Sequence, residues 1–128
     1  MKIAERNSGG NRAVADQLVA TFRDTMISLV RQDGPDLTAR QLSVLLICYL
    51  EDGPHTVRGL AERLEVSKPA ITRALDRLGD LDLARRKQDP EDRRSVLVMR
   101  TLRGSAFLRD LRNIMTGASS RGRAAARA

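Results

Sequence analysis

The sequence predicts a mainly α-helical winged helix-turn-helix, with a small β-hairpin as the wing and one further helix at each end. Three observations support this prediction: two short amphipathic helices joined by a tight turn, a basic hairpin directly after them, and an almost entirely aliphatic core. The only aromatic residues are Phe22, Tyr49 and Phe107. At 128 residues we expect one small domain, with residues 12–116 as its folded part.

The first predicted helix begins at Arg12, after residues 1–11, which are polar and expected to be flexible. Its apolar residues recur three or four positions apart until Gly34-Pro35 ends it, and additional ones widen the stripe toward a second face. Two apolar faces suit packing on the protein's own core and on a partner, or else folding of both faces onto a monomer core. These apolar residues are Val14, Leu18, Val19, Phe22, Met26, Ile27, Leu29 and Val30.

The next segment, QLSVLLICYL, is apolar almost all round, which predicts a buried helix. Thr38 with Gln41 three residues later has the form of a capping box, and Gly53-Pro54 ends this helix. Cys48 within it is expected to be a core residue, although some cysteines sense oxidants when they are exposed. His55, which follows the break, is expected to be an ordinary loop residue.

Two short amphipathic helices come next, separated by a turn at Glu65-Val66 that lacks the usual Gly. Ser67 is a suitable N-cap for the second of them, and Pro69 lies in its first turn, where a missing N–H costs nothing. The second helix, residues 67–81, is predicted to bury one stripe and expose the opposite one. The buried stripe is Ile71, Ala74, Leu75 and Leu78, and the exposed face is Pro69, Thr72, Arg73, Asp76 and Arg77.

A basic β-hairpin is predicted at residues 84–99, with Asp89-Pro90 as a turn-forming pair and Val96 to Met99 as a short apolar strand. Asp92 lies two residues before Arg94, so in a strand-like segment its carboxylate could orient the guanidinium. Five cations lie at or near the tip, namely Arg85, Arg86, Lys87, Arg93 and Arg94.

Thr101 is a suitable cap for a last helix, which has one apolar face. Residues 117–128 are rich in Gly, Ser and Arg and are expected to form a basic, disordered tail. The apolar face of the last helix consists of Leu108, Leu111, Ile114 and Met115.

The formal net charge is +7, and the body of the chain remains basic at +4 when the three cations of the tail are set aside. Positive charge favours nucleic acid or an anionic membrane surface as the partner. Its placement on a hairpin and a short helix favours nucleic acid. No apolar run reaches the ~20 residues that span a bilayer, and residues 1–12 lack the apolar core of a signal peptide. A single cysteine also fits the reducing cytoplasm, where we expect the protein.

A basic helix beside a basic hairpin suits double-stranded DNA, with the helix in the major groove and the hairpin at phosphates or the minor groove. Arg73 could direct two donors to a guanine edge, and Thr72 could contact a base or a thymine methyl. The alternatives are a solvated helix in which Arg73 pairs with Asp76 and Arg77 with Asp80, or an interaction module that docks on an acidic partner protein. The predicted DNA-binding residues are Ser67, Lys68, Pro69, Thr72, Arg73, Arg77, Arg86, Lys87, Asp92, Arg93 and Arg94.

Residues 37–104 resemble the MarR family of bacterial winged-helix transcription regulators. The resemblance lies in the segments LTARQLSVLL, TVRGLAERLEVSKPAITRALDRL and LARRKQDPEDRRSVLVMRTLRG, and the DPEDRRS wing at this distance from the preceding helix is its specific part. By position, residues 67–69 with Thr72 and Arg73 match the family's recognition residues, and Asp92 and Arg94 match its wing Asp-x-Arg.

The resemblance implies a repressor that binds a pseudo-palindromic promoter site as a homodimer, with residues 12–32 and 101–116 at the dimer interface. It also leaves room for a small-molecule effector, because many relatives bind phenolic or other anionic compounds. Two positions depart from the family pattern. Asp82 replaces a Gly after the recognition helix, and Arg100-Thr101 replaces Leu-Thr before the last helix. Asp tolerates the left-handed backbone better than most residues, so we expect the turn to form.

No arrangement of a nucleophile with a base, no Gly-rich phosphate loop and no ligand spacing for a metal is present in the sequence. We therefore expect neither an enzyme nor a bound cofactor or metal.

Overall fold

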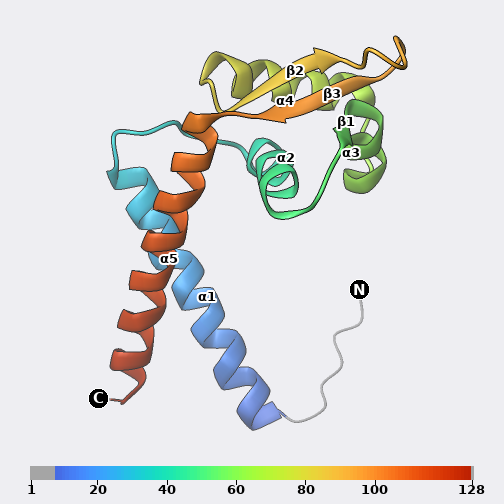
Figure 1. Cartoon of the computed structure of the whole chain (residues 1–128). Helices are drawn as coiled ribbons and strands as arrows, with labels where there is room; N and C mark the ends of the chain where they lie inside the picture. The colour runs from blue at the N-terminus through green and yellow to red at the C-terminus, as the bar shows by residue number, and fades with distance from the viewer. Residues whose placement is uncertain (1–7, 128) are drawn as a thin grey trace. The chain divides into compact units, whose positions relative to one another are not determined.

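The computed structural model describes residues 8–127, which form five helices and three strands (Figure 1). The contacts within the chain divide it into two units: unit 1 contains α1 and α5 from Asp110 onward, and unit 2 runs from Pro35 to Arg109. The elements are α1 (Ser8–Arg31), α2 (Ala39–Leu50), β1 (His55–Thr56), α3 (Val57–Leu64), α4 (Lys68–Asp80), β2 (Ala84–Gln88), β3 (Val96–Arg100) and α5 (Leu102–Arg127). Unit 2 has the predicted winged helix-turn-helix fold.

Helices α3 and α4 form the helix-turn-helix. Thr56 and Ser67 are their N-caps, because their hydroxyl oxygens accept hydrogen bonds from the N–H groups of Gly59 at 2.9 Å and Ala70 at 3.2 Å. Between the two helices Glu65 takes the left-handed conformation with φ 54°, where a Gly is more usual. The turn therefore forms at the position that the sequence predicted, without a glycine.

The three strands form an antiparallel sheet in the order β1-β3-β2. Strands β2 and β3 make the wing, with Ala84 opposite Arg100 at its base and Gln88 opposite Val96 toward its tip. Residues 89–95 close the tip, where the N–H of Asp89 donates to the carbonyl oxygen of Ser95 at 2.9 Å. Strand β2 also packs against α4, so the wing and the second helix of the pair are direct neighbours.

The core of unit 2 is aliphatic, as the composition predicted. Helix α4 buries the whole stripe expected of it, which at about 1.5–3 kcal/mol for each large side chain fixes the helix on α2 and α3. Helix α2 is buried along one face and not all round, since Leu50 at its end is 60 % exposed. The most deeply buried large side chains are Val44, Leu45, Leu60, Ile71 and Leu78.

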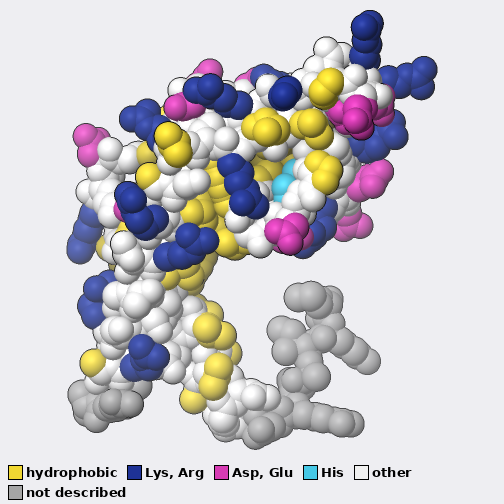
Figure 2. Space-filling view, in the orientation of Figure 1, with side chains coloured by type: hydrophobic (Ala, Val, Ile, Leu, Met, Phe, Trp, Pro, Cys, Tyr) yellow, Lys and Arg dark blue, Asp and Glu magenta, His cyan; other side chains and the backbone are white. Residues whose placement is uncertain are grey.

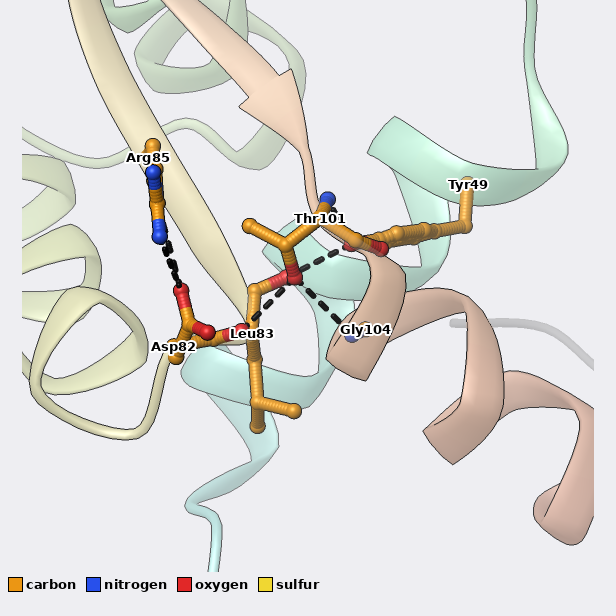
Figure 3. Close-up of polar contacts among 6 residues, drawn as sticks. All are labelled: Tyr49, Asp82, Leu83, Arg85, Thr101 and Gly104. Atoms are coloured by element: carbon orange, nitrogen blue, oxygen red, sulfur yellow. Dashed lines mark hydrogen bonds and ion pairs between the residues drawn. The ribbon is translucent and has the colours of Figure 1, made fainter.

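One tyrosine joins three parts of unit 2 (Figure 3). The hydroxyl of Tyr49 donates to the carbonyl oxygen of Leu83 at 2.6 Å and accepts from the N–H of Thr101 at 2.9 Å. The hydroxyl of Thr101 in turn donates to the carbonyl oxygen of Asp82 at 2.7 Å and accepts from the N–H of Gly104 at 2.9 Å. We call these four hydrogen bonds the Tyr49 clasp. They join the end of α2, the turn after α4 and the start of α5.

Both departures from the family pattern are accommodated beside this clasp. Asp82 takes the left-handed conformation with φ 56°, as expected of a residue in place of Gly. The Arg100 guanidinium lies 5.7 Å from the ring centre of Tyr49 and donates to the carbonyl oxygens of Cys48 at 2.7 Å and Glu51 at 3.2 Å. A cation thereby complements the carbonyl end of α2.

The ends of the outer helices differ from the prediction. Helix α1 begins at Ser8 and not at Arg12, and residues 1–7 of the expected flexible segment lie outside the described residues. Helix α5 continues to Arg127 through the segment that was expected to be a disordered tail, of which Ala128 is not described. Ala and Arg favour helix enough to offset two glycines, and Ala118 is fully buried within unit 1, so packing also holds this part of the helix.

Gly104→Ala is expected to destabilise the protein by about 1–3 kcal/mol, because overpacking forces the surroundings apart. A Cβ at this position would lie 1.7 Å from the Tyr49 hydroxyl oxygen and 2.4 Å from the carbonyl oxygen of Leu83. Urea unfolding followed by circular dichroism measures the change. Gly79→Ala is the matched control: its Cβ would meet nothing closer than 3.9 Å, so stability should stay the same or rise. Equal stability of the two variants would contradict the role assigned to the clasp.

Candidate nucleic-acid interface

The exposed face of α4 carries the residues that the sequence assigned to it. Pro69, Arg73, Asp76 and Arg77 are exposed, and Thr72 is partly exposed. The Ser67 cap satisfies one of the free N–H groups at the start of the helix, and the N-terminal end keeps its partial positive charge beside Lys68. This end of α4 is therefore suited to an anion such as phosphate.

A groove of about 540 Å³ lies between the start of α4, the start of α3 and the wing. It brings together four of the predicted site residues, which come from two segments 20 positions apart in the sequence, namely Lys68, Thr72, Asp92 and Arg94. It also contains Arg58 of α3, which was not among the predicted DNA-binding residues because those were sought on the second helix of the pair and on the wing. The lining residues are Thr56, Val57, Arg58, Lys68, Thr72, Asp92, Arg94, Ser95 and Val96.

Three cations converge on this groove, Arg58, Lys68 and Arg94. The Asp92 carboxylate accepts a hydrogen bond from the backbone N–H of Arg94 at 3.0 Å. The sequence predicted that the Asp92 carboxylate orients the Arg94 guanidinium. The carboxylate bonds to the backbone of Arg94 instead, because residues 89–95 form a turn and not a strand. The carboxylate shapes the backbone at the tip instead, as Asp side chains often do in turns.

The remaining wing residues lie in different surroundings. Lys87 and Arg93 are exposed, and the carbonyl oxygen of Arg93 accepts from Gln88 Nε2 at 2.8 Å. Figure 2 shows Lys and Arg side chains projecting at the tip of the wing. Arg86, by contrast, forms an ion pair with Asp76 of α4. Asp76 therefore pairs with the wing and not with Arg73, which contradicts one of the two pairings considered for a solvated helix.

A second hollow of about 540 Å³ lies between the end of α2, the segment 52–55 that follows it, and strand β3. Its walls are mainly apolar, from Pro54, Leu97 and Met99, with Arg100 and Cys48 beside them. The two terminal guanidinium nitrogens of Arg63, Nη1 and Nη2, donate to the Glu51 carboxylate at 2.8 and 2.9 Å, and this hydrogen bonding lowers the pKa of Glu51.

Within residues 8–127, no group of three or more His, Cys, Asp and Glu side chains is placed to hold a metal ion. The His55 ring lies instead against the backbone, with Nε2 2.8 Å from the carbonyl oxygen of Glu51. In the same described part of the chain, no helix combines the length and the apolar character needed to cross a membrane.

Comparisons with known proteins agree with this geometry. Residues 37–96 match the model of the MarR family. YusO of Bacillus subtilis is 25 % identical with a TM-score of 0.68, over 94 % of this chain and 83 % of that one. The transcriptional regulator BldR of Sulfolobus solfataricus is 26 % identical with a TM-score of 0.58, over 91 % and 81 %.

A third solved structure is the complex of S. aureus MepR with DNA. It is 18 % identical with a TM-score of 0.66, over 91 % of this chain and 90 % of that one, and at this identity the likeness concerns the fold alone. No curated protein matches the sequence.

Cys48 is expected to resist alkylation in the folded protein. It is 4 % exposed, and burial raises the pKa of its thiol to about 11, with the nearby Arg100 charge acting in the opposite direction. At pH 8 the folded thiol is thus less ionised than the unfolded one, and the thiolate is the reactive form. Mass spectrometry after iodoacetamide treatment should show slow modification of native protein and rapid modification in urea. Equal rates would mean that the thiol is accessible.

Proposed function

Because residues 37–96 match the model of the MarR family, we propose that this protein is a transcriptional regulator that binds a specific double-stranded DNA sequence and acts as a repressor. The observation that carries the proposal is the groove in which the start of α4 meets the wing, with Arg58, Lys68 and Arg94 around it. The DNA complex of MepR, which shares the fold, supports the same kind of partner.

In this proposal α4 enters the major groove of DNA. Arg73 directs its two donors to the N7 and O6 atoms of a guanine, and Thr72 contacts a neighbouring base or a thymine methyl. Pro69 and Arg77 flank these two on the same exposed face. Ser67 and Lys68 at the helix start bind phosphate, where the helix dipole favours an anion.

The wing binds beside the major groove. Arg94 reaches the minor groove, which attracts Arg where it is narrow, and Lys87 and Arg93 bind phosphates. Asp92 holds the Arg94 backbone in place at the tip, as its hydrogen bond to that N–H indicates. Arg58, which was found only in the structure, adds a phosphate contact from the start of α3.

We further propose a homodimer built from α1 and α5. Leu18, Phe22 and Val30 of α1 are 66 %, 61 % and 77 % exposed, and Figure 2 shows hydrophobic side chains uncovered along this helix. Soluble monomers rarely expose an apolar stripe of this extent, and such a stripe usually marks a protein–protein interface. A two-fold dimer would present two copies of α4 to a pseudo-palindromic site.

Two further expectations belong to this proposal. A regulator of bacterial promoters acts in the cytoplasm, which fits its single cysteine, buried and unpaired. The apolar hollow beside Arg100 is a place in unit 2 where a small anionic effector could bind.

Titration of genomic DNA fragments at about 50 and 200 mM salt tests the function. Groove binding with several phosphate contacts should weaken by roughly 10³ or more over this range while one sequence remains preferred. A protein that docks on an acidic partner would bind all duplexes weakly and without preference. That outcome would replace DNA recognition by the interaction-module alternative.

Arg73→Ala should cost about 1–3 kcal/mol on the best site and reduce the preference for it, because one bidentate base contact is lost. Fluorescence anisotropy with the selected duplex and a scrambled duplex measures both quantities. Arg40→Ala is the control, since it removes the same charge from the exposed start of α2, away from α4, the wing and the proposed dimer helices. If the Arg73 variant keeps wild-type affinity for both duplexes, Arg73 does not read a base.

The dimer predicts that Phe22→Glu yields a monomer, because it places a charge within the exposed apolar stripe of α1. Sedimentation at micromolar concentration should show twice the chain mass of 14.2 kDa for the wild type and the chain mass for the variant. Ala13→Glu lies on the opposite face of α1 by the helical period and should leave the dimer intact. A wild-type species near 14.2 kDa would refute the proposed dimer.

A further inference from the structure

Arg86 faces a different way from its neighbours in the wing. Side chains alternate along a strand, so Arg86 shares a face of β2 with Ala84, whereas Arg85 and Lys87 lie on the other face. Ala84 is 4 % exposed, and its carbonyl oxygen lies 3.9 Å from the position that a Cβ at Gly79 of α4 would take. The face that carries Arg86 is therefore the one turned toward α4.

On that face Arg86 pairs with Asp76, which lies ten positions earlier in the sequence on the neighbouring helix α4. The Arg86 side chain is 38 % exposed, compared with 70 % for Arg85, whose ion pair with Asp82 stays within the turn. Arg86 thus makes an ion pair that joins the helix to the wing, and it is the more covered of the two arginines.

The ion pair adds to two other connections between α4 and β2, the packing of the strand on the helix and the turn that joins them. In the turn the N–H of Leu83 donates to the carbonyl oxygen of Leu78 at 2.8 Å, and Asp82 takes its left-handed conformation. The turn holds only the start of the strand. A contact between Asp76 and Arg86, two residues into β2, fixes the direction in which the strand leaves the helix.

The negative charge of Asp76 also favours a structural role for the pair. Asp76 lies on the exposed face of α4 with Arg73 and Arg77, where an uncompensated carboxylate would repel phosphate. Pairing with Arg86 offsets that charge and at the same time occupies the guanidinium, which is then not available to a phosphate.

We infer that Arg86 is a positioning residue, which holds the wing at a set angle to α4 through Asp76, and not a direct DNA contact. This inference rests on the proposed function for its effect on DNA, whereas the pairing itself can be measured without DNA. It changes the role that the sequence assigned to Arg86 and separates it from Lys87 and Arg94, which remain phosphate and minor-groove contacts in the proposal.

The first experiment uses the free protein. Thermal unfolding is compared for the wild type, Asp76→Ala, Arg86→Ala and the double variant. Each single change should lower Tm by about 1–5 °C, and the double change should cost clearly less than their sum, because residues in contact are not additive. Additive changes in Tm would show that the two side chains do not interact, and the inference would be overturned.

The second experiment measures affinity for the selected duplex as a function of salt. Arg86→Ala should weaken binding with the salt slope unchanged, whereas Arg94→Ala should lower the slope by about one unit, as loss of one charge contact does. The charge exchange D76R/R86D should regain most of the affinity lost by Arg86→Ala, since it rebuilds the ion pair in reverse. A slope that falls by one unit in Arg86→Ala, with no recovery in D76R/R86D, would make Arg86 a phosphate contact.

The two experiments also separate this inference from the proposed function. If the wild type binds no duplex with preference, the proposed function fails. The unfolding comparison would still decide whether Arg86 and Asp76 hold the wing to the helix.

Discussion

The Tyr49 clasp is the constraint on which the geometry of unit 2 depends. Leu83 directly precedes strand β2 and Thr101 directly follows β3, so one hydroxyl group holds both strands at the base of the wing. The same hydroxyl belongs to α2, whose Val44 and Leu45 lie in the core. A rigid aromatic side chain with a polar end is suited to this task, because the ring packs while the hydroxyl satisfies buried backbone groups. The clasp also explains why residue 104 is Gly.

Acidic side chains determine which cations of the wing remain available. Arg85 pairs with Asp82 and Arg86 with Asp76, so both are engaged within the protein. Lys87, Arg93 and Arg94 are exposed, and no ion pair holds them among the described residues. Simple cation density along the hairpin thus overstates the charge that can meet a partner. The groove concentrates the available charge where α3, α4 and the tip of the wing meet.

Features with local causes were predictable from the sequence. The capping groups of Thr38, Ser67 and Thr101 act within three residues, and each forms the hydrogen bond that its position predicts. The buried stripe of α4 follows from helical period alone. The left-handed conformation of Asp82 was predicted because this residue stands where the MarR pattern has a Gly. The MarR resemblance is likewise confirmed by the family match at residues 37–96.

The features that the sequence analysis missed depend on tertiary structure. The pair of Asp76 and Arg86 and the position of Arg58 arise from packing between elements, for which local periodicity carries no signal. The length of α5 was underestimated because Gly and Ser in its last part indicate a tail, whereas burial of Ala118 favours the helix. The hydrogen-bond partner of the Asp92 carboxylate was predicted wrongly, because it depends on whether residues 89–95 form a strand or a turn.

Strand β2 is an edge of the sheet, since the order is β1-β3-β2. An open edge presents unpaired backbone groups that can recruit a strand from another molecule, and charged side chains prevent this. The sequence of this strand is ARRKQ, and the positive charges of two copies would repel each other in such a pairing. The basic strand therefore protects the folded protein from aggregation. Neutralising all three cations of β2 at once would expose a sheet edge that can pair between molecules.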